Sequence, residues 1–351
     1  MKRVFVLSFI LVLLTGSTVF SQSYVFQFRQ KGSKLWGYAS TDGKIFIEPK
    51  FELSSPFSEE GVATALYKSI YYVINLKGEI VETEAEPIRP YLNYWNGLPQ
   101  GFLDGYLVVS KNYLLYGCIN HLGEITIPIQ YSRFTRFNSG FALAERNKIF
   151  YVIDKQGNEI PLEAKDIVNI WHFSEGLGTI EVKGQKWGFV DGEGKTAIEP
   201  LFDGTGYFNG GLAWARSHKG KLGYINKTGQ WAIPPQFEVA KDFDPESGLA
   251  LVKIDGDWGY TNTEGKISFF YESEKLSDYS NGLSVGNKGS KVGFLDKNGL
   301  WVIQPQFDDA RSFHFGYAAA ELDGRWGIID KTGSWVVQPK YIDIRDVAEV
   351  N

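Results

Sequence analysis

The chain has 351 residues, with 36 basic and 41 acidic side chains and a formal net charge of −5 at pH 7. Its acids and bases are interspersed, so the sequence excludes a protein that binds the phosphate backbone of nucleic acids, which needs a basic face. Cys118 is the only cysteine, which excludes an intramolecular disulfide. Aromatic residues make up 15% of the chain and can supply a large core without crosslinks.

The N-terminus has the pattern of a secretory signal peptide. Lys2 and Arg3 precede an apolar run over residues 4–14, and Val19 and Ser21 stand at −3 and −1 of a cleavage site before Gln22. The run is too short to span a bilayer as a helix. We therefore expect residues 1–21 to be removed. Residues 22–351 should then act as one exported domain in the periplasm, on the outer surface or outside the cell.

The rest of the chain repeats itself. A block with the pattern aromatic-Gly-aromatic-apolar-Asx-x-x-Gly recurs nine times, mostly at steps of 34 to 36 residues. The second glycine of the block falls at Gly43, Gly78, Gly123, Gly157, Gly194, Gly229, Gly265, Gly299 and Gly333. Self-similarity at this period is typical of repeat architectures, in which each unit buries its apolar face against its neighbours.

The last unit shows the expected local structure. Three short apolar runs, 317–321, 326–330 and 335–341, are separated by turns at Asp323-Gly324 and at 331–333. Such a pattern predicts a β-meander of three strands. The Asx residue three positions before the second glycine, Asp330 in this unit, is typical of a type I turn that ends in a glycine with positive φ. We prefer this role to calcium binding, because the glycine spacing of calcium β-rolls is missing.

Three further positions recur in most units. A glycine inside the second strand, such as Gly223, predicts a close approach, and we expect an aromatic side chain of a neighbouring unit to lie across it. The third run carries an Ile-x-Pro-x-Phe pattern, whose proline fits a sheet edge. An aromatic residue before the next unit, such as Phe313, should belong to the core. The aromatic residues at this third recurring position are Phe57, Phe137, Phe173, Phe208, Phe243, Tyr279 and Phe313.

Some units depart from the rule. Repeats 2 and 4 carry Tyr72 and Tyr151 in place of the mid-strand glycine and lack the Pro-x-Phe element, and repeat 7 keeps its glycine but lacks the proline. An insertion at 87–102 follows repeat 2 and contains Tyr91, Tyr94 and Trp95. Rigid aromatic residues on a proline-rich loop are typical of binding hot spots, so these three form our candidate ligand site. The alternative is that the insertion covers the irregular faces of repeats 2 and 4.

These blocks resemble the WG repeat family, also called KWG repeats, after the Trp-Gly pair at Trp36, Trp187, Trp258 and Trp326. The resemblance covers nearly all of the chain after residue 21. It implies a β-rich repeat protein, common in bacteria and often preceded by a signal peptide, and it implies no defined activity.

We predict an all-β tandem array of about nine three-stranded meanders, stacked as a solenoid-like or superhelical body. The alternative is a closed β-propeller. The segment 24–29 resembles the first strand of a unit without its preceding loop. A strand there could start an open stack or join the last unit of a ring.

No catalytic motif is evident, and we predict neither a cofactor nor a metal site. The four histidines, His121, His172, His218 and His314, fall at different places within their units. Cys118 replaces an apolar residue and should be buried. The sequence therefore favours an exported, non-enzymatic binding or scaffold protein whose partner is a protein or an envelope glycan. The alternative is a hydrolase of envelope polymers, which needs two placed carboxylates, or a carbohydrate-binding module.

Overall fold

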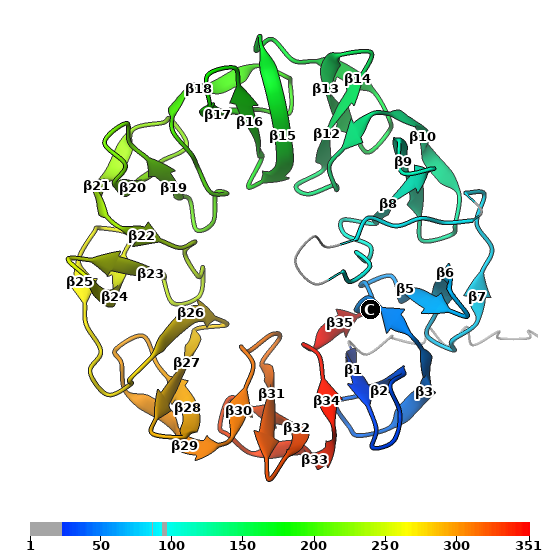
Figure 1. Ribbon diagram of the computed structural model, residues 1–351, viewed down its shortest axis with the longest axis vertical. Coiled ribbons are helices and arrows are strands. Elements are labelled where there is room, and N and C mark those ends of the chain that lie inside the picture. Colours follow the sequence, from blue (N-terminus) through cyan, green and yellow to red (C-terminus); the bar gives the residue numbers. More distant parts are fainter. Residues whose placement is uncertain (1–22, 86, 93–96) are drawn as a thin grey trace, which may run out of the picture.

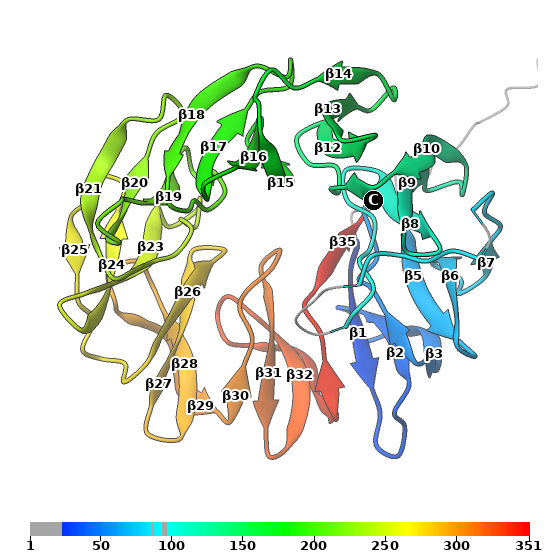
Figure 2. The same cartoon turned by 45° about the horizontal axis from the view of Figure 1, so that its top comes forward.

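The computed structural model describes residues 23–85, 87–92 and 97–351, which form strands, turns and loops throughout. Figure 1 shows nine small antiparallel sheets arranged as blades around a central axis, and the tilted view in Figure 2 shows the same ring. The architecture is a nine-bladed β-propeller. The all-β repeat prediction is confirmed, and of the two expected arrangements the closed propeller is the one that forms, not the open array.

We number the blades from the N-terminus and give the strands of each from the axis outwards. Blade 1 contains β34 (Asp343–Ile344), β1 (Ser23–Arg29), β2 (Trp36–Ser40) and β3 (Ile45–Phe51), and β35 (Ala348–Val350) also pairs with β1. Blade 2 contains β4 (Leu53–Ser54), β5 (Val62–Tyr67), β6 (Ile70–Asn75) and β7 (Ile80–Val81). Blade 3 contains β8 (Tyr106–Lys111), β9 (Leu115–Asn120) and β10 (Ile125–Tyr131). Blade 4 contains β11 (Arg133–Phe134), β12 (Phe141–Arg146), β13 (Ile149–Asp154) and β14 (Glu159–Pro161).

Blade 5 contains β15 (Ile167–Ser174), β16 (Leu177–Val182), β17 (Lys186–Val190) and β18 (Thr196–Phe202). Blade 6 contains β19 (Ala213–Arg216), β20 (Leu222–Ile225) and β21 (Trp231–Phe237). Blade 7 contains β22 (Val239–Ala240), β23 (Leu249–Ile254), β24 (Asp257–Asn262) and β25 (Ile267–Ser268). Blades 8 and 9 contain β26 (Leu276–Ser280), β27 (Leu283–Lys288), β28 (Lys291–Leu295) and β29 (Trp301–Phe307); and β30 (Asp309–Ala310), β31 (Tyr317–Leu322), β32 (Arg325–Asp330) and β33 (Trp335–Tyr341).

The expectation of three strands per unit is wrong by one strand. Most blades have a fourth, innermost strand, and in blades 1, 2, 4, 7 and 9 it begins two residues after the outermost strand of the preceding blade ends. For example, β33 ends at Tyr341 and β34 begins at Asp343. In blades 3 and 6 single bridges, Pro90 to Val109 and Thr205 to Ala215, take this place. Several innermost strands are only two residues long, so no alternating pattern in the sequence could reveal them.

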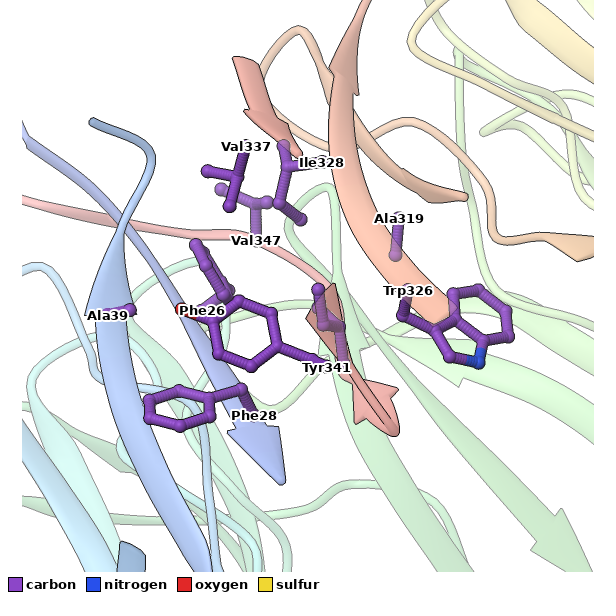
Figure 3. Close-up of a cluster of buried hydrophobic side chains, with 10 residues drawn as sticks. Phe26, Phe28, Ala39, Ala319, Trp326, Ile328, Val337, Tyr341 and Val347 are labelled. Carbon is purple, nitrogen blue, oxygen red and sulfur yellow. The ribbon is translucent and has the colours of Figure 1, made fainter. Parts of the chain in front are cut away.

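The two ends of the chain close the ring together in blade 1. Strand β1 pairs with β2 on one side and with β34 on the other, where Phe28 lies opposite Ile344. Figure 3 shows the core at this joint, where Phe26 and Phe28 from the N-terminal strand pack beside Tyr341. The guanidinium of Arg345 lies 3.9 Å from the Trp36 ring centre, which adds a cation–π contact across the joint.

The mid-strand glycines allow the outermost strand to approach closely. A methyl group at Gly223 would lie 2.4 Å from the carbonyl oxygen of Ile233 in β21, and the corresponding glycines of five other blades face the same backbone position. These six glycines are Gly37, Gly117, Gly188, Gly223, Gly293 and Gly327. The close contact comes from the backbone of the blade's own outermost strand. Our expectation of an aromatic side chain from a neighbouring unit is therefore wrong.

Other predicted positions have the expected roles. The seven recurring aromatic residues that include Phe313 are all buried, as is Cys118. The second glycines of the block have positive φ, for example 84° at Gly333. The carboxylate of Asp330 accepts hydrogen bonds from the backbone N–H groups of Thr332 and Ser334, at 2.8 and 3.1 Å. This geometry is that of an Asx turn.

Replacing Gly223 with alanine should destabilise blade 6 by about 1–3 kcal/mol, because the new methyl group has only rigid backbone to displace. Gly204 in the same blade is the matched control. A methyl group there would meet its nearest atom, in the Trp214 ring, at 3.8 Å, so Gly204→Ala should change the free energy of unfolding by less than about 1 kcal/mol. Urea denaturation of both variants measures the difference. Equal effects would contradict the backbone contact.

Candidate functional site

The residue directly before each buried core aromatic varies from blade to blade. In blades 4 to 8 these residues are Arg136, His172, Tyr207, Asp242 and Asp278, and we call them the axial row. They stand at or next to the innermost strands, and none of them is fully buried. Charges of neighbouring members influence each other: Arg136 acts on His172, and Asp278 acts on Asp242. The uniform frame thus presents a variable set of side chains near the axis.

A hollow of about 560 Å³ lies beside one end of this row. Three blades contribute to it: the insertion belongs to blade 3, β11 and the residues after it to blade 4, and β15 to blade 5. The lining residues of this axial hollow are Tyr91, Leu92, Gln100, Arg133, Phe134, Thr135, Arg136, Asn169, Ile170, Trp171 and His172. Strand β15 has eight residues and is the longest innermost strand of the described chain, which extends this wall.

Aromatic stacking holds the flat side chains of the axial hollow in place. The ring centre of Trp171 lies 4.0 Å from that of Trp187, with 25° between the planes. Tyr91 stacks on Tyr116 at 4.9 Å, and His172 stacks on Tyr207 at 4.0 Å. A stacked ring has little freedom to lose when a ligand binds, so the walls are organised before any ligand arrives.

The two arginines of the axial hollow differ in their partners. Arg133 forms an ion pair with Glu145 at 3.1 Å, and its guanidinium donates a hydrogen bond to the side chain of Asn169 at 3.1 Å. Within the described residues, the Arg136 guanidinium has neither a hydrogen bond nor an ion pair. Burial lowers the pKa of Arg136. An arginine without a counterion can bind a carboxylate or other oxygen acceptors of a ligand.

Burial, with the charge of Arg136 as a smaller cause, lowers the pKa of His172 to about 4. The imidazole is therefore neutral at physiological pH. Further along the axial row the sign reverses: burial and then the charge of Asp278 raise the pKa of Asp242 to about 6, and burial raises the pKa of Asp278. The axial row thus has one basic end and one acidic end.

The predicted ligand residues are divided by the structure. Tyr91 is half-buried and lines the axial hollow, whereas Tyr94 and Trp95 lie outside the described residues. The insertion also contributes to the core, because Ile88 and Phe102 are buried together with Val62 and Leu107 between blades 2 and 3. The ends of the insertion therefore pack on blades 2 and 3, whereas the alternative interpretation had named repeats 2 and 4. Tyr91 lines the axial hollow, and its role in ligand binding stays a prediction.

Sequence reasoning missed Trp171, His172, Arg133 and Arg136 as site residues. An alignment of the repeats on their buried aromatic residues would have placed Arg136 and His172 at one variable position. The described residues contain no group of three or more histidine, cysteine or acidic side chains that could hold a metal ion. In that same part of the chain, no helix is long and apolar enough to cross a membrane.

The repeats identify the family. The sequence profile described as "WG containing repeat" matches residues 36–67, 116–148, 187–221, 223–257, 293–326 and 326–349, which together are more than half of the chain. The chain belongs to the WG-repeat family. The resemblance drawn from the Trp-Gly pairs is confirmed. No curated protein is significantly similar to this WG-repeat protein.

Two solved structures resemble this WG-repeat protein at low sequence identity. The crystal structure of a eukaryotic initiation factor is 11% identical, with a TM-score of 0.61, over 94% of this chain and 98% of that one. Apo AztD from Citrobacter koseri is 10% identical over the same shares of the two chains, with a TM-score of 0.42. At such identity the first likeness supports the propeller fold and nothing about function.

The two titrating ends of the axial row should act on stability with opposite signs. His172 has a pKa of about 4 when folded and 6.5 ordinarily, so the unfolded chain binds more protons and stability falls as pH drops from 6.5 towards 4. Asp242 has a pKa of about 6 when folded and 3.8 ordinarily, so stability falls as pH rises from 3.8 towards 6.

The variants His172→Gln and Asp242→Asn should each remove one of these slopes. Urea denaturation between pH 4 and pH 7 measures them by comparison with the unmodified protein. Two variants whose pH profiles match that of the unmodified protein would show that burial does not act on these groups.

Proposed function

We propose that this WG-repeat protein is a non-enzymatic binding protein, exported under the direction of residues 1–21, that works as a scaffold in the bacterial envelope or the extracellular space. The axial hollow is the observation that carries this proposal. Its volume of about 560 Å³ falls within the range of small-ligand sites, which is about 300–1,000 Å³. Residues from three successive blades line it, so a ligand there would contact a surface that no single blade provides.

The chemistry of the axial hollow fits a ligand with a flat face and oxygen acceptors. Trp171 and Tyr91 offer stacked aromatic faces, and Arg136 offers a guanidinium that has no counterion among the described residues. An extended protein segment with an acidic side chain meets these demands, and so does a glycan strand. The partner is therefore a protein or an envelope glycan, as the sequence suggested.

The lining of the axial hollow also supports the absence of catalysis there. Its titratable lining residues are Tyr91, Arg133, Arg136 and His172. Among the described lining residues there is no aspartate, glutamate or cysteine that could act as a nucleophile or orient the imidazole. Hydrolysis by a carboxylate pair needs two acids on either side of the bond. The axial hollow offers binding groups without such a pair.

Loss of a flat wall should abolish binding without unfolding the ring. We expect Trp171→Ala and Arg136→Gln each to weaken capture of the native partner from the envelope fraction by about tenfold or more, as for hot-spot residues. Trp231→Ala, at a partly exposed position on the outermost strand of blade 6, is the control and should leave capture unchanged. Immobilised protein and quantitative mass spectrometry give the measurement. Equal capture by all variants would refute the axial hollow as the site.

Carbohydrate binding is the second candidate, favoured by the planar polar side chains of Gln100, Asn169 and Arg133 beside the Trp171 ring. Aromatic faces stack on sugar rings, and planar side chains hydrogen-bond to hydroxyl groups. The alternative of a hydrolase depends on the Asp242 and Asp278 carboxylates, whose raised pKa values are the kind that catalytic acids have.

Soluble fragments of bacterial cell-wall glycan distinguish the two candidates. Binding in the axial hollow should change tryptophan fluorescence on titration, and Trp171→Ala should lose that change while the fragments keep their length. Shortened fragments, produced by the unmodified protein and not by Asp242→Asn, would instead establish hydrolysis. Chromatography of the same samples reports fragment length.

A further inference from the structure

Blade 7 differs from six other blades at its outer edge. In blades 1, 3, 5, 6, 8 and 9 the outermost strand has seven residues and ends in a buried aromatic residue. These residues are Phe51, Tyr131, Phe202, Phe237, Phe307 and Tyr341. The outermost strand of blade 7, β25, has only two residues. Figure 1 shows it as a short arrow at the outer edge, followed by a long connection to β26.

The chain of blade 7 has the usual length but lacks the aromatic side chain. Tyr341 stands eight positions after Gly333 in blade 9, and Ser273 stands eight positions after Gly265 in blade 7. In blade 9, Tyr341 lies opposite Trp326 in the sheet register. Strand β24 is paired on its outer side only at Tyr260 and Thr261 among the described residues, so Trp258 has Lys253 of β23 opposite it on the inner side and no strand residue opposite it on the outer side.

A hollow remains where the aromatic side chain is missing. Its volume is about 480 Å³, and Trp258, Phe269, Tyr271 and Ser273 are among its lining residues. We call it the blade 7 socket. Trp258 is 44% exposed, whereas the corresponding Trp36 of blade 1 is 5% exposed. Tyr271, which stands where blade 9 has Pro339, is 90% exposed. Grouped exposed aromatic side chains of this kind mark interaction sites.

The mid-strand glycines show that the blade 7 socket is a special case. In blades 2 and 4, Tyr72 and Tyr151 replace the glycine, and their outermost strands are short because a side chain there blocks the backbone approach seen at Gly223. Blade 7 keeps Gly259, yet its outermost strand, β25, stops after two residues. The Phe269 ring lies over Gly259 in place of the proline backbone, with ring atoms 3.0 and 3.2 Å from the position of a methyl group.

The cause is a register change of one residue. In blades 5, 6, 8 and 9 the register shifts twice between the last two strands, which marks a bulge, whereas β24 and β25 pair without a shift. Ser268 takes the register position that the isoleucine or valine has in those blades, and Phe270 contacts the turn glycine of the next blade, Gly299, as Ile303 contacts Gly333. The residues after Phe270 are displaced and leave the edge of β24 at Trp258 open.

We propose that the blade 7 socket binds an extended segment of a partner protein that carries an aromatic residue two positions after a proline. Five blades of this chain, blades 1, 5, 6, 8 and 9, supply the occupant's chemistry themselves, because their own outermost strands place an aromatic residue two positions after a proline opposite the position of Trp258. Strand addition at an open sheet edge provides backbone hydrogen bonds, and the blade 7 socket provides selectivity for the aromatic side chain. The site lies at the outer edge and is independent of the axial hollow.

A peptide copied from β29 tests the proposal on the full-length protein. The probe has the sequence of residues 301–307, Trp-Val-Ile-Gln-Pro-Gln-Phe, and the control peptide has serine in place of its last residue. Fluorescence anisotropy of the labelled peptides should show binding at least about tenfold tighter for the aromatic peptide, because burial of one aromatic ring contributes more than 1.4 kcal/mol. Equal binding of both peptides, or no binding of either, would overturn the proposal.

Variants of the protein locate the binding. Ser273→Phe adds a ring to the lining of the blade 7 socket and should reduce binding of the aromatic peptide at least tenfold. It also removes the hydrogen bonds of the buried Ser273 hydroxyl with the backbone of Lys275 and Asn287, so its melting temperature should fall. Leu201→Phe, which adds a ring at an exposed position of β18, should bind as the unmodified protein does. If Ser273→Phe fails to fold, Trp258→Ala should give the same loss of binding. Unchanged affinity in the folded variants would refute the site.

Sedimentation velocity tests whether the blade 7 socket instead binds a second copy of this chain. The proposal expects a monomer whose mass does not depend on concentration. A dimer that forms in the unmodified protein and is lost in Ser273→Phe would assign the blade 7 socket to self-association and would overturn the proposal of a foreign segment.

Discussion

The pairing of β1 with β34 and β35 holds the two ends of the chain in one blade, and the other eight blades depend on it. Each blade buries its apolar face only against its neighbours, so an open stack would leave two end faces exposed to water. At the joint, Phe28 and Ile344 lie opposite each other across the first and last strands of the chain. The cost of bringing such distant residues together grows only slowly with chain length, and burial of this core offsets it.

A second constraint acts inside each blade. The mid-strand glycine allows the backbone of the outermost strand to lie within contact distance, and this strand then carries its last aromatic residue into the core. Tyr72 and Tyr151 break this requirement in blades 2 and 4, and there the outermost strand shortens. Gly259 satisfies the requirement in blade 7, yet Ser273 supplies no aromatic side chain. Blade 7 thus keeps the mid-strand glycine but lacks the aromatic residue at the end of the outermost strand, and it is the blade that has the blade 7 socket.

The frame separates stability from recognition. The core aromatic residues hardly vary in type, whereas the residues next to them near the axis change from Arg136 through His172 to Asp242. His172 and Asp278 lie on innermost strands, where successive side chains point to opposite faces, so their chemistry can differ without disturbing the core aromatic residue that follows them. The axial hollow combines this variable row with an insertion that breaks the period. Its walls therefore come partly from the regular repeats and partly from the insertion at 87–102.

The sequence by itself determined the all-β repeat, the turns around residues such as Asp330, the buried aromatic residues and the units that depart from the rule. These features are local: turn geometry and side-chain burial depend on residues close together in the chain. It also identified Tyr91 as a residue of interest.

The tertiary structure alone decided the closed ring, the fourth strand of most blades and the partners of the glycines. Closure is a contact between residues more than 300 positions apart, Phe28 and Ile344, and the angle between successive blades that permits it arises from packing that no single unit encodes. Five of the innermost strands, β4, β11, β22, β30 and β34, have two residues each and are too short to leave a pattern. Trp171, Arg136 and Tyr91 share the axial hollow only because three blades meet there, so their proximity could not be read from their spacing.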